Sequence, residues 1–476
     1  MTGFFGAVAG ILGIGFWFYV ILNWRRGIWG LCLYMPFGGA VALYLHPSKL
    51  PLLAKDLVFV VPAYIAFFVF NTRLLRQAPI PQGLLACMGA MALIVLLQTL
   101  NPGILHWMVA AIGAKVWLFY IPLIFMGAAF LRTQDDLVRF LRVMVGIAIV
   151  PCMIGLLQWF GSATFGYQET ITAFYGDRAA NATQGFASFD YGGDYYRIPA
   201  TFTFTSQYFG YTWAMIVMAY ALMRIDPSAN WRRFSLLMMG VFMVASVLSG
   251  ARSALVFVPI LLILIVFLDQ RIKGILAGVV LMPVMVLGAL YLGGIDPFAV
   301  FNATQVLVTN YGKDLVLANL IEAIWNHPLG IGTGMNTGPA RHAFGDIQVL
   351  TYLESYYAKA IVELGFFGGV AVFATWAALI VYAIRIVRQI REQALKGVAA
   401  AFTGFFIALA IHSGKGWQID YDPVNVYFWL FAGFLFKLPY LQGQRAPQKR
   451  RTAMPLHGLR RPTRGGLPVP RPQDAA

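Results

Sequence analysis

Three cationic side chains lie within or at the edge of long apolar stretches of the 476-residue chain, namely Lys115, Arg197 and Arg252. An ionisable residue costs about 2.5–3.5 kcal/mol at the centre of a membrane span, so it marks a functional site by default. Arginine binds phosphate oxygens in a bidentate manner. The three residues therefore predict a site for a phosphorylated ligand. A buried structural ion pair is the alternative for Lys115, and a contact with lipid headgroups is the alternative for Arg252.

The densest group of polar residues follows an amphipathic run over residues 315–325. Pro328 and three alternating glycines end this helix and permit close backbone approach to a ligand. The pattern does not open a Rossmann unit, so alone it is weak support for phosphate binding. The candidate ligand-contacting residues of this region are His327, Gly330, Gly332, Gly334, Arg341, His342, Ser355 and Tyr356.

Glu354 lies at the predicted outer mouth of a later apolar span. A partly desolvated carboxylate acts as a general base, and pairing with a nearby arginine is the alternative. For His327 and His342, packing or hydrogen bonding is favoured, and ligand contact is the alternative. Tyrosines of the same region are suited to stacking on sugar rings.

The composition indicates the environment in which these residues lie. Only 11% of residues are charged and 59% are hydrophobic, with a mean hydropathy of +0.71, whereas soluble domains carry about 25% charged residues. This excludes a soluble multidomain enzyme, a disordered chain, a nucleic-acid-binding protein and a disulfide scaffold. The three cysteines show no zinc or disulfide spacing, no metal or other cofactor is expected, and the N-terminus does not resemble a cleaved signal peptide.

A helix that spans a membrane needs about 20 mostly apolar residues. The sequence predicts an all-α polytopic membrane protein with 12 or 13 spans, because apolar runs of this length satisfy their backbone in lipid only as helices. The thirteen candidate spans are centred near residues 13, 36, 64, 90, 118, 151, 212, 241, 261, 284, 372, 405 and 431.

The distribution of basic residues sets the predicted orientation. With the N-terminus outside and the C-terminus inside, 25 of the 35 Lys and Arg residues fall on the inner side, as the positive-inside rule requires. The net charge of +16 thus has a topological cause. The remaining basic residues include Lys115, Arg197, Arg252 and Arg341.

Six segments follow from this threading. N-terminal membrane helices over residues 1–160 precede a first outer loop over 161–202, and central helices over 203–293 precede a second, catalytic outer loop over 294–357. C-terminal helices occupy 358–440, and a basic, disordered cytoplasmic tail occupies 441–476. The two long loops contain regularly spaced aromatic residues, so they are expected to be folded. The tail is suited to lipid headgroups, or serves only as a topology signal.

Three motifs occur in order over roughly residues 100–440. They are Arg197 followed by a Thr-Phe stretch, a Ser-x-x-Arg-Ser turn around Arg252, and a His-Pro-Leu-Gly-x-Gly loop that leads to a Glu-Leu-Gly-aromatic-aromatic-Gly segment ending at Gly368. Together they resemble the O-antigen ligase and O-antigen polymerase family of bacterial inner-membrane proteins.

The resemblance implies a metal-independent, inverting glycosyltransferase whose donor is a glycan on undecaprenyl diphosphate at the periplasmic face. In ligases the acceptor is lipid A-core, and in polymerases it is another lipid-linked repeat unit. Ligases of the family place a His followed by Asn where this chain has Glu354 and Ser355, which favours a polymerase of exopolysaccharide, capsule or O-antigen. A flippase and a chain-length regulator are the expected protein partners, besides membrane lipids; nucleic acid is not expected.

The competing class is a transporter such as a lipid-linked oligosaccharide flippase. Transporters show internal repeats and polar sites at the membrane midplane, whereas this sequence has no clear repeat and places its unusual charges near the outer edge. An enzyme is therefore favoured. In the resulting hypothesis, Arg197 and Arg252 hold the diphosphate leaving group, with Lys115 or Arg341, and Glu354 activates the acceptor.

Overall fold

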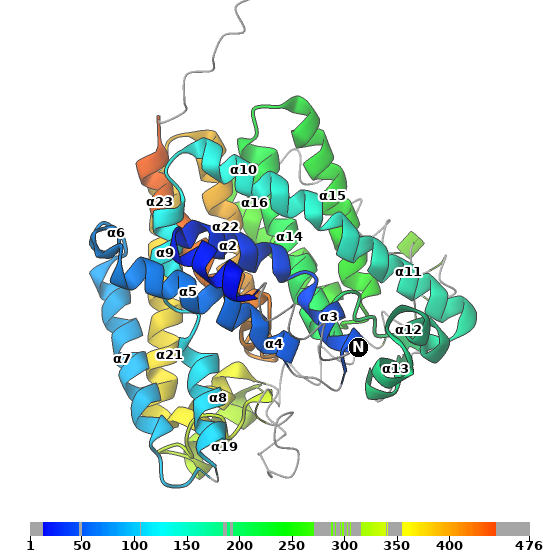
Figure 1. Ribbon diagram of the computed structural model, residues 1–476, viewed down its shortest axis with the longest axis horizontal. Coiled ribbons are helices and arrows are strands. Elements are labelled where there is room, and N and C mark those ends of the chain that lie inside the picture. Colours follow the sequence, from blue (N-terminus) through cyan, green and yellow to red (C-terminus); the bar gives the residue numbers. More distant parts are fainter. Residues whose placement is uncertain are drawn as a thin grey trace, which may run out of the picture.

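A computed structural model describes residues 13–46, 50–104, 106–183, 188–190, 194–270, 316–338, 340 and 355–443, with isolated positions between 287 and 305. Within these residues the protein is a bundle of helices with one short antiparallel strand pair (Figure 1). Glu354, Arg341, His342, the span predicted near residue 284 and the tail beyond residue 443 lie outside the described residues.

Seven helical segments of the described residues are long and apolar enough to cross a membrane, which supports a multi-pass membrane protein. They are α7 (Gln82–Thr99), α8 and α9 (Trp107–Leu118 and Leu123–Phe130), α10 and α11 (Gln134–Ile147 and Ile149–Phe165), α15 (Ala229–Leu248), α21 (Tyr356–Gln389), α22 (Gln393–His412), and α23 with η6 (Val424–Lys437 and Leu438–Leu441). A pair bent by 60°, α2 (Trp24–Tyr34) and α3 (Gly38–Tyr44), makes an eighth if it counts as one span.

Two further predicted spans are helical without meeting that criterion. Helix α14 (Thr205–Ile225) contains Thr, Ser, Gln and Tyr among its apolar residues and is buried along nearly its whole length. A helix surrounded by other helices does not need an apolar lipid-facing surface. Helix α16 (Ala254–Asp269) is highly apolar but only 16 residues long, shorter than the roughly 20 residues that cross a bilayer.

The span predicted near residue 64 is a run of short helical segments rather than one regular α-helix. It comprises α4 (Leu50–Lys55), η1 (Asp56–Val60), α5 (Val61–Tyr64) and η2 (Ile65–Val69), of which η1 and η2 are π-helical, and α6 (Thr72–Arg76) follows. π-Helical turns are rare and often occur at functional sites. The first of them begins at Asp56, a buried carboxylate.

Close backbone contact holds α9 against α23. A Cβ atom at Gly433 would lie 2.2 Å from the carbonyl oxygen of Ile124, and one at Gly127 would lie 2.7 Å from that of Leu430. Small residues let membrane helices approach in this way, so that van der Waals contact holds them together. Aromatic side chains then fill the bundle around Phe434, which contacts Phe130 and Phe140.

The described part of the first predicted outer loop is folded. It contains α12 (Tyr167–Tyr175), α13 (Asp177–Thr183) and the strands β1 (Ser188–Asp190) and β2 (Asp194–Tyr196). The described part of the second contains α19 (Val316–Asn326), which matches the predicted amphipathic run. A single 3-10 turn, η5 (Gln418–Asp420), lies between α22 and α23.

Polar contacts join the chain segments at one end of the bundle, near α10 and the end of α23, while α19 lies at the other end (Figure 1). Gln134 donates to the Glu392 carboxylate and to the carbonyl of Leu441, both at 2.9 Å. Arg224 pairs with Asp269 and donates to the carbonyl of Gln393. This is the end that carries the basic residues assigned to the inner side.

Candidate functional site

The structure brings the two arginine motifs together. The Ile198 amide donates to the carbonyl of Ser249 at 2.9 Å. Gly250 has a φ of +80°, and a Cβ atom there would lie 2.3 Å from the carbonyl oxygen of Tyr196 and 2.7 Å from Cα of Arg197. Only glycine fits this turn, because both the left-handed backbone and the lack of space exclude a side chain. The half-buried Arg197 and Arg252 therefore start from adjacent backbone segments.

The glycine loop, residues 327–334, begins where α19 ends. Gly330, Gly332 and Gly334 all have positive φ, at +78°, +100° and +88°. The alternating glycines thus serve a backbone that turns into the left-handed region at every second residue. His327 lies half-buried at the start of the loop, and its carbonyl accepts from the Gly330 amide at 3.1 Å.

The backbone that approaches these glycines belongs to the protein itself. The Ile331 and Gly332 amides donate to the carbonyls of Val362 and Glu363 at 2.9 and 3.1 Å. Helix α21 offers these carbonyls because Gly365, at φ +78°, breaks its regular hydrogen bonding. The sequence predicted close approach to a ligand, and the observed close approach is to α21 and α8.

Helix α8 closes the other side of the loop. A Cβ atom at Gly113 would lie 2.1 Å from the Gly334 nitrogen, and one at Gly334 would lie 2.1 Å from the carbonyl oxygen of Val109. Thr333 is fully buried, and its hydroxyl donates to the carbonyl of Ala110 at 3.1 Å. The loop is therefore fixed between α7, α8 and α21.

Glu363 connects these elements through a fully buried carboxylate. One oxygen accepts from the Asn336 amide and from the Thr337 hydroxyl, both at 2.8 Å, and the other accepts from Nε1 of Trp117 at 2.7 Å. A buried carboxylate is tolerated when donors surround it in this way. Glu363 thus ties α21 to α8 and to the segment after the glycine loop.

A buried ion pair lies one helical turn before Glu363. Lys359, fully buried, pairs with Asp420 of η5, and its ammonium lies 4.6 Å from the ring centre of Trp117. Burial raises the pKa of Asp420, and the neighbouring Lys359 ammonium opposes this rise. Ser355 caps the start of α21, where its hydroxyl accepts from the Ala358 amide, and Tyr356 packs against Trp117.

Lys115 belongs to a second charged cluster. Its ammonium pairs with Asp56, so the structure places it in an ion pair while one third of its side chain stays exposed. Lys55 also contacts Asp56, at 3.2 Å, and Asp422, at 2.9 Å. The Tyr120 hydroxyl donates to Asp56 at 2.6 Å and accepts from Lys55 at 2.8 Å.

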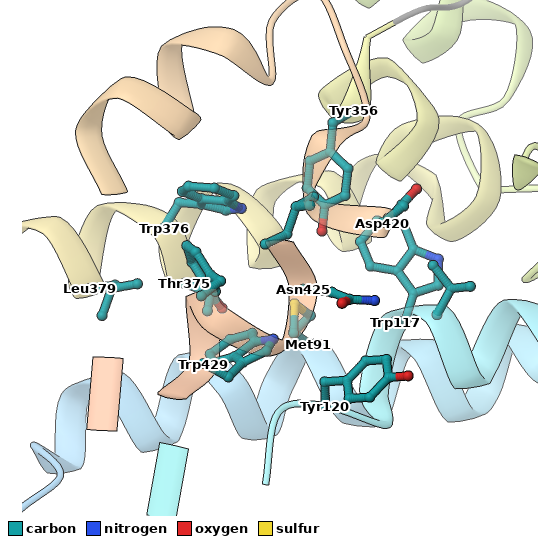
Figure 2. Close-up of a pocket in the computed structure, with 13 residues that line it drawn as sticks. Met91, Trp117, Tyr120, Tyr356, Thr375, Trp376, Leu379, Asp420, Asn425 and Trp429 are labelled. Carbon is teal, nitrogen blue, oxygen red and sulfur yellow. The ribbon is translucent and has the colours of Figure 1, made fainter. Parts of the chain in front are cut away.

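A small cavity lies beside the two charged clusters, where Asp420 of one and Tyr120 of the other line it together with aromatic side chains (Figure 2). Its volume is about 30 Å³, which exceeds the roughly 10–15 Å³ that a cavity needs to hold one water molecule. Trp376 and Leu379 line it on one side, and Trp117 and Asp420 on the other (Figure 2). The full lining is Met91, Val116, Trp117, Tyr120, Tyr356, Thr375, Trp376, Leu379, Ile419, Asp420, Asn425, Phe428 and Trp429.

Tyr421 lies between the segment that follows Arg197 and the segment that follows the glycine loop. Its ring packs edge-on against Phe204 at 4.9 Å, and a Cβ atom at Gly338 would lie 3.8 Å from it. Its neighbours in the chain, Asp420 and Asp422, form ion pairs with Lys359 and Lys55, respectively. The segment 418–423 is therefore the centre of the candidate site.

Sequence reasoning missed six charged residues of this region. The argument used for Lys115, that a charge within an apolar stretch marks a site, also applies to the adjacent Lys55 and Asp56. The spacing of Lys359 and Glu363 places both on one helical face. The remaining two residues, which no spacing relates to the others in the sequence, are Asp420 and Asp422.

Among the described residues, no three His, Cys, Asp or Glu side chains are grouped so as to hold a metal ion. No protein-family model matches the chain, and no curated protein shows a significant sequence match. The arrangement of the site must therefore carry the functional argument.

Proposed function

We propose that this protein is an inner-membrane glycosyltransferase that polymerises undecaprenyl-diphosphate-linked repeat units at the periplasmic face. The observation that supports it most directly is the adjacency of the Arg197 and Arg252 motifs in a multi-pass helical bundle. A diphosphate leaving group needs such cations, since electrostatic stabilisation of developing charge is commonly the largest catalytic term.

The proposed reaction is a single displacement at the anomeric carbon of the donor. The acceptor hydroxyl attacks this carbon, the bond to the diphosphate oxygen breaks, and the diphosphate keeps the electron pair. Arg197 and Arg252 neutralise that charge, and Glu354 accepts the hydroxyl proton. Attack from the face opposite the leaving group inverts the anomeric configuration.

Two alternatives share part of the same support. An O-antigen ligase uses the same donor, and its product is glycan attached to lipid A-core. A lipid-linked oligosaccharide transporter is favoured by one specific observation, the buried charges of Lys55 and Asp56, since ionisable groups within membrane domains also mark transport pathways. Purified protein that extends a lipid-linked glycan without a membrane gradient would exclude the transporter.

Substitution of the arginines tests the proposal. We expect Arg197→Ala and Arg252→Ala each to lower polymer formation at least 100-fold at unchanged protein level, because each removes a cation from the leaving group. Arg391→Ala, an exposed arginine at the opposite end of the bundle, serves as the control and should keep full activity. Normal polymer in both test variants would refute the proposal. Unchanged activity in Glu354→Gln would remove Glu354 as the base.

A further inference from the structure

The cluster of Lys55, Asp56, Lys115 and Asp422 combines charges from three separate parts of the chain. Lys55 and Asp56 lie where α4 passes into the π-helical η1, Lys115 lies on α8, and Asp422 follows η5. Two ammonium groups contact the single carboxylate of Asp56. They are therefore held close enough together for one small anion with several oxygens to reach both.

The four members are not held equally. The side chains of Lys55 and Asp56 are only 7% and 6% exposed, whereas those of Lys115 and Asp422 are 33% and 27% exposed. Asp56 also accepts from Tyr120, so several donors fix it. The cluster is thus rigid at its buried side and accessible through Lys115 and Asp422.

Asp422 is the more weakly held of the two carboxylates. One of its oxygens pairs with Lys55 at 2.9 Å, while Oδ1 is buried and has no hydrogen-bond partner among the described residues. A buried acceptor without a donor carries a desolvation cost. Of the two carboxylates, Asp422 is therefore the one that an incoming anion replaces at the smaller cost.

We propose that Lys55 and Lys115 bind the diphosphate group of a membrane-embedded substrate, and that Asp422 holds the place of a phosphate oxygen until this substrate arrives. The inference rests on the proposed function for the source of the diphosphate, and it adds Lys55 and Asp422 to the predicted contact of Lys115. Asp56 stays in place and keeps the two ammonium groups together.

The charge balance explains why the exchange favours a diphosphate. Two lysines and two aspartates leave the cluster neutral, so both ammonium groups are already paired, and the Lys55 side chain is also buried. An anion with two or three charges gains contact with both lysines, whereas Asp422 contacts only Lys55. A singly charged carboxylate ligand would gain little by replacing Asp422, so Asp422 favours ligands of higher charge.

The position of the cluster fits this role. Asp422 directly follows Tyr421, whose ring packs against Phe204 in the segment after Arg197. The segment that carries Asp422 therefore contacts the segment that follows Arg197.

Direct binding measurements test the inference on the purified full-length protein in lipid nanodiscs. Isothermal titration calorimetry with inorganic pyrophosphate and with farnesyl diphosphate measures both possible sources of the diphosphate. We expect Lys115→Gln to weaken binding at least tenfold, since it removes one ammonium. We expect Asp422→Asn to strengthen binding about fivefold, since it removes the competing charge while keeping the shape. Lys396→Gln, at the opposite end of the bundle, is the matched control.

The direction of the Asp422→Asn effect decides the matter, because a merely structural role predicts weaker or unchanged binding. The inference is overturned if Asp422→Asn binds diphosphate more weakly than the parent protein or equally well, provided that both proteins elute at the same volume in size-exclusion chromatography. Stronger binding of farnesyl diphosphate than of pyrophosphate assigns a lipid-linked ligand, and equal binding assigns a free diphosphate; both retain the site. If the parent protein and its variants bind diphosphate as expected but the parent forms no polymer, only the proposed function is overturned. Normal polymer formation in Lys115→Gln with unchanged diphosphate affinity overturns this inference alone.

Discussion

Gly334 has almost no space for a side chain. Its φ is +88°, and a Cβ atom would lie 2.1 Å from the carbonyl oxygen of Val109 on α8. Both the backbone conformation and the contact with a neighbouring backbone oppose substitution, and a backbone atom of a packed helix does not move aside cheaply.

We therefore expect Gly334→Ala to lower the free energy of unfolding by about 2–4 kcal/mol, from backbone strain and overpacking together. Gly89→Ala is the control, because Gly89 lies in α7 with no atom within 4 Å of its Cβ position. Alanine should stabilise that helix slightly. Thermal unfolding in detergent compares the two variants, and equal melting temperatures would contradict the assignment of Gly334 to a closed contact.

At the residue scale, part of the candidate site was predictable. Glycine spacing indicated an unusual backbone. The charges of Lys115, Arg197 and Arg252 predicted a site for a phosphorylated ligand, with a buried ion pair as the alternative for Lys115. The partners themselves were not predictable, because Lys115 meets Asp56 and Lys359 meets Asp420 only through tertiary packing. The place of the glycines against α8 depends on the same packing.

At the scale of elements, α19 shows an apolar outer surface. Ala323 packs inward against α21, while Trp325 is 79% and Ile321 50% exposed. Leu329 just beyond α19 is bound through its carbonyl to Gln98 near the end of α7, at 2.6 Å. The exposed apolar surface therefore continues that of α7, where Leu97 and the following Leu100 are also exposed.

We expect α19 to lie in the membrane interface with Trp325 in contact with lipid, as aromatic residues do at membrane boundaries. In a chain without its native cysteines, a spin label at Trp325→Cys should be more accessible to oxygen than to a water-soluble nickel chelate. A label at the exposed Glu322→Cys should show the reverse preference. Preference for the nickel chelate at both positions would place α19 in water.

Irregular elements were the least predictable ones. The apolar run around residue 64 indicated a span, but the π-helical segments η1 and η2 follow from packing and not from any local pattern. Helix capping depends on local sequence and is easier to predict. Thr133 and Asp136, for example, form a reciprocal capping box at the start of α10.

At the scale of the whole molecule, the two ends of the bundle differ in chemistry. One end carries Arg224, Arg391 and Lys396, and the other carries the glycine loop and the charged clusters of the candidate site. We expect the basic end to face the cytoplasm, as the positive-inside rule predicts.

Cysteine accessibility tests this orientation. We expect Gly103→Cys, in the exposed turn after α7, to react with a membrane-impermeant maleimide in intact spheroplasts. Arg391→Cys, exposed at the basic end, should react only after the membrane is permeabilised. The reverse pattern would invert the protein in the membrane and place the candidate site in the cytoplasm.

Apolar length predicted the helical membrane fold, and the seven spans found by length and hydropathy agree with predicted positions. The predicted number of thirteen counted α14 and α16 as equal to the others. Hydropathy of a sequence does not distinguish a helix exposed to lipid from one, like α14, that other helices surround.

The break at Gly365 also determines how the protein fits the thickness of a bilayer. Without it, the 34 residues of α21 would form a rod about 51 Å long, which is far longer than the roughly 30 Å hydrocarbon layer. Such a rod would tilt steeply or leave several turns stranded. With the break, residues 366–389 alone give about 36 Å, enough to cross with a small tilt. The segment from Tyr356 to Leu364 then does not need to cross the bilayer and can carry the charged residues Lys359 and Glu363. Gly365 thus separates the membrane-spanning part of α21 from the part that contributes to the candidate site.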